Sequence, residues 1–346
     1  MKASREKPAV SRKGLELKYQ MNKTGIDKLQ KIIDQCRLKS PCNVEIRFNE
    51  PMKDHTTFKV GGPADCWVRP DGDGFTAFCT ALISSARKEA IPVFILGGGA
   101  NIVVCDKGIR GIVLDMSAWN GHSVWALCAG AGELVLKSGT DIDEASDIAV
   151  ASGLSGLEFL AGMPGTIGGA VWMNARCYGR ETADVLNWAE IIDFSACAHG
   201  GEGEIMRIGA KEGFGYKLSP FQKMDCLILS AAFKLKKGNK NKILNEMEKN
   251  RQDRQEKGHY LFPCAGSAFK NNHDFGKPTG QIIDELGMKG LQIGGAQIAP
   301  FHGNIVINTG NAAAKDIRAL MDEAAAKVKA ATGFVLEPEI LFVGEW

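Results

Sequence analysis

The sequence predicts an α+β fold, in which antiparallel ribbons of strands pack against helices. Three segments in the middle of the chain alternate apolar and polar residues with turns between them, which is typical of antiparallel strands: 188–194, 204–208 and 227–236. Helical spacing of apolar residues precedes and follows them, most clearly at 75–90 and 314–332. The 41 glycines indicate many tight turns and close backbone approaches.

The same patterns predict the remaining elements in chain order. The expected helices are 25–36, 75–90, 141–152, 242–254, 279–286 and 314–332. The expected strands are 44–48, 54–70 (interrupted at Gly61, Gly62 and Pro63), 93–96, 112–116, 124–128, 188–194, 204–208, 227–236, 303–307 and 339–343. A change of composition at 236–242 (KKGNKNK) predicts a linker.

Length and charge limit the possible classes of protein. The 346 residues are enough for two or three domains, and the net charge of +2 gives no overall attraction to nucleic acid or membrane. Residues 1–40 hold 11 Lys and Arg against 4 Asp and Glu, and we interpret residues 1–18 as a solvated basic tail because a nucleic-acid arm would carry interleaved aromatics. There is no apolar run long enough for a membrane span, and residues 1–20 lack the apolar core of a secretory signal.

The ten cysteines are scattered, without CxxC pairs, and no HExxH or Cys/His cluster occurs. We therefore expect buried, reduced thiols and no metal site.

Two glycine-rich stretches carry the strongest signal for function. The first, Leu96–Gly108 (LGGGANIVVCDKG), directly follows an apolar strand, where successive backbone N–H groups can point into one concavity that suits phosphate. The second places Gly162, Pro164, Gly165, Gly168 and Gly169 within eight residues. Neither is a Walker loop or a Rossmann fingerprint. A dinucleotide such as FAD would satisfy both, while two tight loops at a domain seam explain the spacing equally well.

Further segments bring in a resemblance to a known family. They are HTTFKVGGPAD (55–65), GGGANIVVCDKGIRG (97–111), GLEFLAGMPGTIGGAVWMNARCYG (156–179), FGYKLSPF (214–221), AGSAFKNN (265–272), GGAQIAPFHGNIVINTGNAAAKDI (294–317) and LEPEI (336–340). In this order they resemble UDP-N-acetylenolpyruvoylglucosamine reductase, also called UDP-N-acetylmuramate dehydrogenase. The resemblance covers residues 49–344. The short distance from FGYK to AGS is similar to the family's subtype without an extra substrate loop.

The resemblance implies an FAD-binding domain of the vanillyl-alcohol-oxidase or PCMH type in two lobes, followed by an α+β substrate domain. The implied boundaries are 1–42 for the basic tail and short helix, 43–236 for the FAD-binding domain (lobes about 43–110 and 111–236), and 237–346 for the substrate domain. The implied cofactor contacts are Gly97, Gly98, Gly99, Ala100, Asn101, Ile102, Gly162, Met163, Pro164, Gly165, Thr166, Gly168, Gly169, Ala170, Val171 and Arg254.

Three residues match the family's catalytic positions. Ser267 matches the serine that protonates C2 of the enolpyruvyl group after the flavin has delivered hydride to C3. Lys217 stands where the family has arginine, so it supplies the charge without the planar fork. Glu339 matches a carboxylate that stabilises the intermediate or relays protons. Because Pro338 keeps the chain extended, the neighbouring Glu337 should face the opposite way.

Four further residues match substrate contacts: Tyr178, Asn271, Lys289 and His302. Departures from the family pattern include Ala100 for serine, Asn272 for proline, and Arg176 and Cys177 for Gly-Ala. Arg176 either contacts a diphosphate or points to solvent. We expect Lys217, Arg254, Lys270 and Lys289 to gather near one cleft and attract polyanionic ligands.

The function implied by the resemblance is reduction of UDP-N-acetylenolpyruvoylglucosamine with NADPH through bound FAD, in the synthesis of the peptidoglycan precursor for the bacterial cell wall. NADPH and the UDP-sugar would bind in turn at one site of a cytoplasmic monomer or weak oligomer, with no nucleic-acid partner and no metal. Two alternatives stay open: another flavin oxidoreductase of the same superfamily, or a flavin-binding regulatory relative that has lost catalysis.

Overall fold

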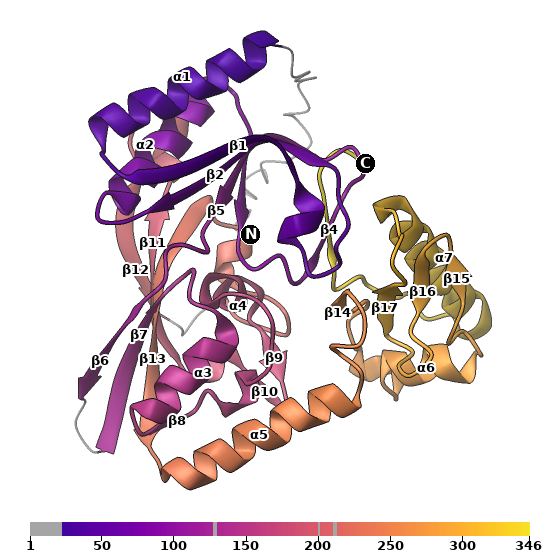
Figure 1. Cartoon of the computed structure of the whole chain (residues 1–346). Helices are drawn as coiled ribbons and strands as arrows, with labels where there is room; N and C mark the ends of the chain where they lie inside the picture. Colours follow the sequence, from indigo (N-terminus) through magenta and orange to yellow (C-terminus); the bar gives the residue numbers. More distant parts are fainter. Residues whose placement is uncertain (1–22, 127–129, 200, 210–212) are drawn as a thin grey trace, which may run out of the picture.

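The described residues form three larger sheets with their helices and two further sheets of two strands each (Figure 1). The computed structural model describes residues 23–126, 130–199, 201–209 and 213–346. The basic tail expected at 1–18 and the last residues of the strand expected at 124–128 lie outside these ranges. The α+β class is confirmed, because two of the three larger sheets are antiparallel and helices pack against all three.

The first sheet has the strand order β1-β2-β5-β3, with β2, β5 and β3 parallel to one another. Its strands are β1 (Asn43–Pro51), β2 (Pro63–Asp71), β5 (Ile109–Asp115) and β3 (Val93–Leu96). Apolar side chains of α1 (Lys23–Lys39) and α2 (Phe75–Lys88) cover one face. Residues around β4 (Ile102–Val104) cover the other. Burial on both faces explains the continuous apolar run that marks β5 in the sequence, whereas β3 is an edge strand with Ile95 exposed.

The second sheet is antiparallel, in the order β12-β11-β13-β7-β6, with β8 (Leu154–Ser155) added beside β13. Its strands are β6 (His122–Ala126), β7 (Ala131–Lys137), β11 (Leu186–Asp193), β12 (Glu204–Gly209) and β13 (Cys226–Lys237). The helices α3 (Ile142–Ala151) and α4 (Ile167–Met173) share its core. Asp141 begins α3 by accepting the amides of Asp143 and Glu144, as an N-cap residue does.

The linker expected at 236–242 is wrong. Strand β13 continues to Lys237, α5 (Lys240–Glu256) begins three residues later, and the Asn239 side chain caps it. A run of lysines is typical of solvated coil. Here the polar side chains lie on the end of a strand and on the first turn of a helix, and both of these can have one side open to solvent. Ile243 and Met247 of α5 pack against Val150 and Ala161, and the helix runs from the second sheet toward the third (Figure 1).

The third sheet is antiparallel, in the order β14-β17-β16-β15, and packs with α6 and α7. These elements are β14 (Cys264–Ser267), α6 (Thr279–Glu285), β15 (Gln292–Ile293), β16 (Ala296–Ile298), β17 (Ile305–Asn308) and α7 (Ala314–Thr332). The chain then returns to the first sheet, where β18 (Leu341–Val343) pairs in parallel with β4. This return places the Leu336–Ile340 segment between the third sheet and the first glycine-rich turn.

The helices of the described ranges include none that is both long and apolar enough to cross a membrane. All nine cysteines in those ranges are free; five are buried and four are half-buried, so full burial was predicted correctly only for the five. The described part of the chain holds no group of three His, Cys, Asp or Glu side chains arranged to bind a metal.

Candidate functional site

The two glycine-rich turns lie in direct backbone contact. The first turn (97–102) connects β3 to β4, and the second (162–171) leads into α4. A Cβ placed on Gly98 would lie 2.6 Å from Gly165 Cα, and one placed on Gly97 would lie 2.6 Å from Thr166 Oγ1. Only glycine allows this approach. The structure therefore brings together the two stretches that stand about sixty residues apart in the sequence.

A row of unpaired amides lines this contact. Within the described residues, the N–H groups of 97–101 meet no acceptor, and those of Gly165 and Thr166 are also unpaired. The hydroxyls of Thr57 and Ser138, which touch the two turns, are buried without a partner there. A buried polar group without a hydrogen-bond partner lowers the stability of the fold, unless a ligand or water supplies that partner. Convergent backbone N–H groups are what a diphosphate requires, so the turns fit the FAD predicted from the sequence.

Other residues of the second turn are already engaged within the fold. The amides of Gly162, Met163, Gly168, Gly169 and Ala170 donate to Asp143, Leu160, Ser138, Thr166 Oγ1 and Thr166 O. Ala170 and Val171 are buried, with Val171 fully inside the core of the second sheet. Among the amides of the second turn, only those of Gly165 and Thr166 are open to a ligand.

Arg254 reaches the second turn from α5. Its Nε donates to the Gly162 carbonyl at 2.9 Å, and Nη1 contacts Cys177 Sγ at 3.7 Å. Tyr260 donates its hydroxyl to the same carbonyl at 2.5 Å. Arg254 is buried, so its charge is held at the turn rather than in solvent. This placement agrees with the expectation that Arg254 lies at the cofactor site.

Lys217 and Glu339 form a largely buried ion pair. Lys217 Nζ lies 2.5 Å from Glu339 Oε1, and the two side chains are 13% and 10% exposed. Lys217 has a φ of 55° in a tight turn closed by hydrogen bonds between Gly215 and Leu218. A non-glycine residue rarely takes this conformation, which indicates that the turn is held by its surroundings.

Ser267 lies next to the segment that carries Glu339. It ends β14, and the following Ala268 carbonyl accepts the Glu339 amide at 2.9 Å. As Pro338 predicted, the two carboxylates diverge: Glu339 is buried, whereas Glu337 is exposed and pairs with Lys270 at 2.5 Å. The candidate acid, the cation and the carboxylate are thus brought together from three distant segments.

The first glycine turn is tied to this group. Asn101 Nδ2 donates to the Glu339 carbonyl at 3.1 Å, and the Leu341 amide donates to the Asn101 carbonyl at 3.0 Å. Together with the pairing of β18 and β4, these bonds fix the catalytic candidates relative to the unpaired amides. Asn101 therefore serves the site through its side chain as well as its backbone.

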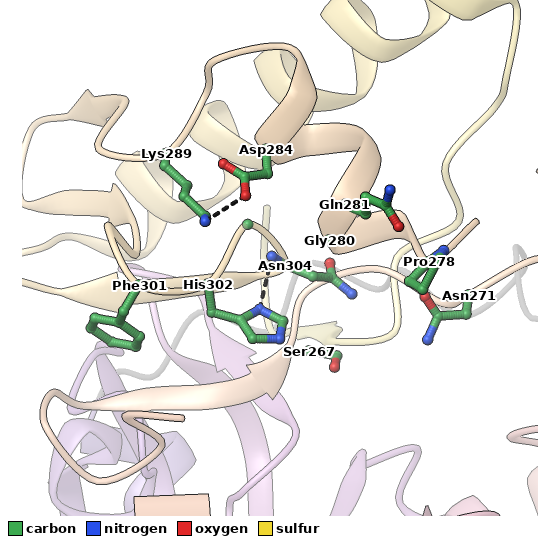
Figure 2. A pocket seen from close by; sticks show the side chains of 11 residues that line it. Ser267, Asn271, Pro278, Gly280, Gln281, Asp284, Lys289, Phe301, His302 and Asn304 are labelled. Atoms are coloured by element: carbon green, nitrogen blue, oxygen red, sulfur yellow. Dashed lines mark hydrogen bonds and ion pairs between the residues drawn. The ribbon is translucent and has the colours of Figure 1, made fainter. Parts of the chain in front are cut away.

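A pocket of about 310 Å³ opens on the third sheet (Figure 2). It includes Ser267 and three of the four residues predicted to contact substrate. Its lining is Ser267, Asn271, Pro278, Gly280, Gln281, Asp284, Lys289, Phe301, His302, Gly303 and Asn304. Figure 2 shows Ser267 at its border, between His302 and Asn271. Such a cavity, lined by amides, a cation and an imidazole, is large enough for part of a nucleotide sugar.

Fixed hydrogen bonds set the polarity of the pocket. His302 Nδ1 accepts the Asn304 amide at 3.1 Å, so the neutral ring carries its proton on Nε2. Burial lowers the pKa of His302, and the positive charges of Lys257 and Lys289 lower it further. Asn271 Oδ1 accepts the Thr279 amide at the start of α6, which leaves the Asn271 NH₂ group for a ligand.

Tyr178 lies elsewhere. Its hydroxyl contacts Asp253 Oδ2 at 2.9 Å and the Asn250 carbonyl at 3.0 Å, both on α5, and the residue is not among those lining the pocket. Burial and the Asp253 carboxylate raise the pKa of Tyr178. The structure places Tyr178 beside Arg254 and the second turn instead of beside Ser267.

The expected gathering of free positive charge is not seen. Lys217 pairs with Glu339, Lys270 with Glu337, and Lys289 with Asp284, each at 2.5 Å. Lys217 and Lys270 are neutralised by carboxylates from distant segments, whereas Asp284 lies five residues before Lys289. Simple attraction of polyanions by these lysines is therefore weaker than predicted.

Sequence reasoning missed Asn174, which connects the second turn to Lys217. Asn174 is fully buried at the end of α4 with a φ of 47°. Its side chain donates to the Gly215 carbonyl at 2.8 Å and accepts the Ala183 amide at 3.0 Å. Asparagine at the end of a helix tolerates the left-handed conformation, and this was the available signal. Helix α4 thus spans from the glycine contact to the turn that holds Lys217.

Comparisons with known proteins agree with this geometry. A model described as FAD binding domain matches residues 77–196, and one described as UDP-N-acetylenolpyruvoylglucosamine reductase, C-terminal domain, matches residues 256–343. The UDP-N-acetylenolpyruvoylglucosamine reductase of Borreliella burgdorferi is 41% identical over 85% of this chain and 93% of its own length. The chain belongs to the UDP-N-acetylenolpyruvoylglucosamine reductase family. The reductase of Treponema denticola is 39% identical over 87% of this chain and 94% of its own.

A solved structure gives the same result for the fold. The UDP-N-acetylenolpyruvylglucosamine reductase of Thermus caldophilus superposes with a TM-score of 0.67 at 31% identity, over 87% of this chain and 99% of that one. The predicted family, the FAD-binding domain followed by the family's C-terminal domain, and FAD as cofactor of a flavin-dependent oxidoreductase are therefore confirmed. The subtype without the extra loop stays a prediction.

Proposed function

We propose that this chain reduces the enolpyruvyl group of UDP-N-acetylenolpyruvoylglucosamine with NADPH, giving UDP-N-acetylmuramate for peptidoglycan synthesis. One observation carries the proposal: backbone and side-chain hydrogen bonds tie the segment of the buried Lys217–Glu339 pair both to the first glycine turn and to the strand end with Ser267, which borders a pocket of about 310 Å³. Bound FAD would pass a hydride equivalent from NADPH to the substrate. The amides of 97–101, Gly165 and Thr166 would hold its diphosphate.

The roles of the side chains follow from their chemistry. Ser267 supplies the proton to C2 of the enolpyruvyl group through its hydroxyl, the proton donor at the pocket border. Lys217 stabilises negative charge that builds on the substrate carboxylate, since a fixed ammonium in a dry site acts strongly on developing charge. Glu339 holds Lys217 in position and accepts or relays protons. Asn271, Lys289 and His302, which line the pocket, are proposed substrate contacts, whereas Tyr178 hydrogen-bonds α5 and a contact of Tyr178 with substrate rests on the family resemblance alone.

The proposed division into an FAD-binding domain and a substrate domain follows the arrangement of the sheets. Residues 43–236 would form the FAD-binding domain and 237–346 the substrate domain. The separate cores of the second and third sheets support this division, although the buried face of α5 packs on the second-sheet side. We further propose a cytoplasmic monomer or weak oligomer without nucleic-acid partners. The free cysteines support a reducing compartment.

The test is product formation. The purified, FAD-loaded protein is incubated with NADPH and UDP-N-acetylenolpyruvoylglucosamine, and the products are analysed by mass spectrometry. The proposal expects a UDP-sugar heavier by the mass of two hydrogens, formed in equal amount with NADP⁺. NADPH consumption that does not depend on the UDP-sugar would contradict it and favour a different flavin oxidoreductase.

A further inference from the structure

Arg176 lies on the border between the flavin side and the pocket side of the site. It belongs to β9 (Arg176–Cys177), which pairs with β10 (Arg180–Glu181). Its guanidinium carbon lies 5.4 Å from the centroid of the Tyr216 ring. Tyr216 precedes Lys217, and its hydroxyl accepts the amide of the pocket residue Asn271 at 3.3 Å. A half-buried guanidinium is thereby stacked against a ring that contacts the pocket lining.

Arg176 differs from the neighbouring cations in its partners. Lys217, Lys270 and Lys289 each have a carboxylate, and buried Arg254 donates to the Gly162 carbonyl. Among the residues that the structure describes, Arg176 donates to no acceptor and forms no ion pair.

The opposite strand does not supply Arg176 with a carboxylate. Glu181 is its partner residue in the hairpin, but within the described residues no ion pair joins the two side chains, and the Glu181 amide donates to Asp184 Oδ2 at 2.9 Å. Arg180, on the same hairpin, is 4.0 Å from Glu158 and stacks on Phe159. Arg176 therefore keeps its N–H donors while the Tyr216 ring covers one face of the guanidinium.

The charge balance of the site gives this arginine a function. The three lysines are neutralised in pairs, yet the proposed ligands are polyanions: a UDP-sugar with a diphosphate and a carboxylate, and NADPH. An arginine whose N–H groups have no acceptor can bind such oxyanions through bidentate hydrogen bonds from its planar guanidinium, which lysine cannot do. Stacking on Tyr216 orders the side chain in advance, which lowers the entropy lost on binding.

We propose that Arg176 is a ligand-binding residue that pairs with a phosphate or carboxylate oxyanion of the molecule bound beside Ser267. This inference rests on the proposed function and adds to it one specific contact. The oxyanion belongs either to the UDP-sugar substrate or to NADPH. Both sources offer the same chemistry, and binding measurements separate them.

The test compares the FAD-loaded wild type with Arg176→Gln and Arg176→Lys. Binding of UDP-N-acetylenolpyruvoylglucosamine, UDP and NADP⁺ is followed by the change in flavin absorption, or by calorimetry where the flavin does not respond. Arg180→Gln is the matched control, because it removes the other arginine of the same hairpin, which already has a carboxylate. Flavin content and the urea midpoint show whether each variant is folded.

The expected result is a Kd about tenfold or more higher in Arg176→Gln for at least one ligand, with a partial recovery in Arg176→Lys and no change in Arg180→Gln. A loss shared by UDP and the substrate identifies the diphosphate, a loss for the substrate alone identifies its carboxylate, and a loss for NADP⁺ alone identifies the reductant. Unchanged Kd values for all three ligands, in a wild type that binds and reduces the substrate, would overturn the role of Arg176 and leave the proposed function intact. A wild type that binds none of the three would overturn both.

Discussion

Lys217 and Glu339 meet across a sequence separation of more than one hundred residues, with 2.5 Å between Nζ and Oε1. The pair joins a turn between β12 and β13 of the second sheet to the segment that leads into β18. Around it lie Ser267 and the Asn101 side chain. The energetics and the chemistry of the proposed site both depend on this contact.

Removing the positive charge should destabilise the fold. Lys217→Met leaves the Glu339 carboxylate buried without its partner, and the free energy of unfolding is expected to fall by about 3 kcal/mol. The control is Lys270→Met, which breaks the pair with the 69% exposed Glu337 and should cost less than about 1 kcal/mol. Urea unfolding measures both. Equal losses in the two variants would show that burial adds nothing to the Lys217 pair.

Restoring the arginine found in the family pattern should preserve function. Lys217→Arg keeps the charge beside Glu339 and adds a planar group that can bind a carboxylate through two bonds. Turnover within about tenfold of the wild type is expected in a steady-state assay of NADPH consumption. A complete loss of turnover in a folded, flavin-containing variant would mean that the catalytic role was carried over to Lys217 wrongly.

The contact between the glycine turns should tolerate no side chain. In Gly98→Ala the new methyl group would meet Gly165 Cα at 2.6 Å, so the turns must separate, and we expect loss of FAD with about 1–3 kcal/mol of destabilisation. Gly209→Ala is the control: among the residues that the structure describes, its Cβ would meet only the Asn187 carbonyl at 3.9 Å, and its φ is not in the left-handed region. The ratio of FAD to protein after gel filtration is the measurement. Full FAD content in Gly98→Ala would show that the turns do not hold the cofactor.

Acid should destabilise the protein through His259. Burial, with help from the Arg254 charge, lowers the pKa of His259 from 6.5 to about 4. Between these two pH values the unfolded chain binds a proton that the folded chain does not, so the free energy of unfolding falls as the pH drops through this window.

Protonation linked to His259 is expected to remove about 2 kcal/mol from the free energy of unfolding as the pH falls from 6.5 to 4, discounted for partial exposure of the ring. His259→Gln should therefore flatten the pH dependence of urea unfolding between pH 6.5 and 4. His122→Gln, at an exposed position on β6, should leave it unchanged. Parallel pH profiles for the wild type and His259→Gln would contradict the assignment.

Local patterns in the sequence predicted most of the elements but few of the contacts. The strand Val93–Leu96 and the helix Ala314–Thr332 were predicted with the boundaries that the structure shows, because an apolar run and a 3.6-residue period are local signals. The strand Ala131–Lys137 was missed. Helix α4 begins at Ile167 rather than at Ala170, where the small residues after the glycines indicate a helix start, since Gly168 and Gly169 indicate turns until Thr166 and the packing against Ser138 fix them as helical.

The sequence could predict which residues belong to the site, but not which ion pairs they form. The motifs identified Ser267, Lys217 and Glu339 through the family resemblance. The partners Glu339 and Glu337, which neutralise Lys217 and Lys270, depend on long-range packing that no spacing encodes, whereas Asp284 lies five residues before Lys289. The open guanidinium of Arg176 became informative only when its neighbours were found to be paired.

The most direct test of the account separates the two half-reactions. FAD-loaded wild type and Ser267→Ala are mixed without oxygen, first with NADPH and then with UDP-N-acetylenolpyruvoylglucosamine, while the flavin absorption is followed. We expect NADPH to bleach the flavin at the same rate in both proteins, and the substrate to restore the colour quickly only in the wild type. Equal slowing of both half-reactions in Ser267→Ala, or a flavin that the substrate never reoxidises in the wild type, would contradict the account.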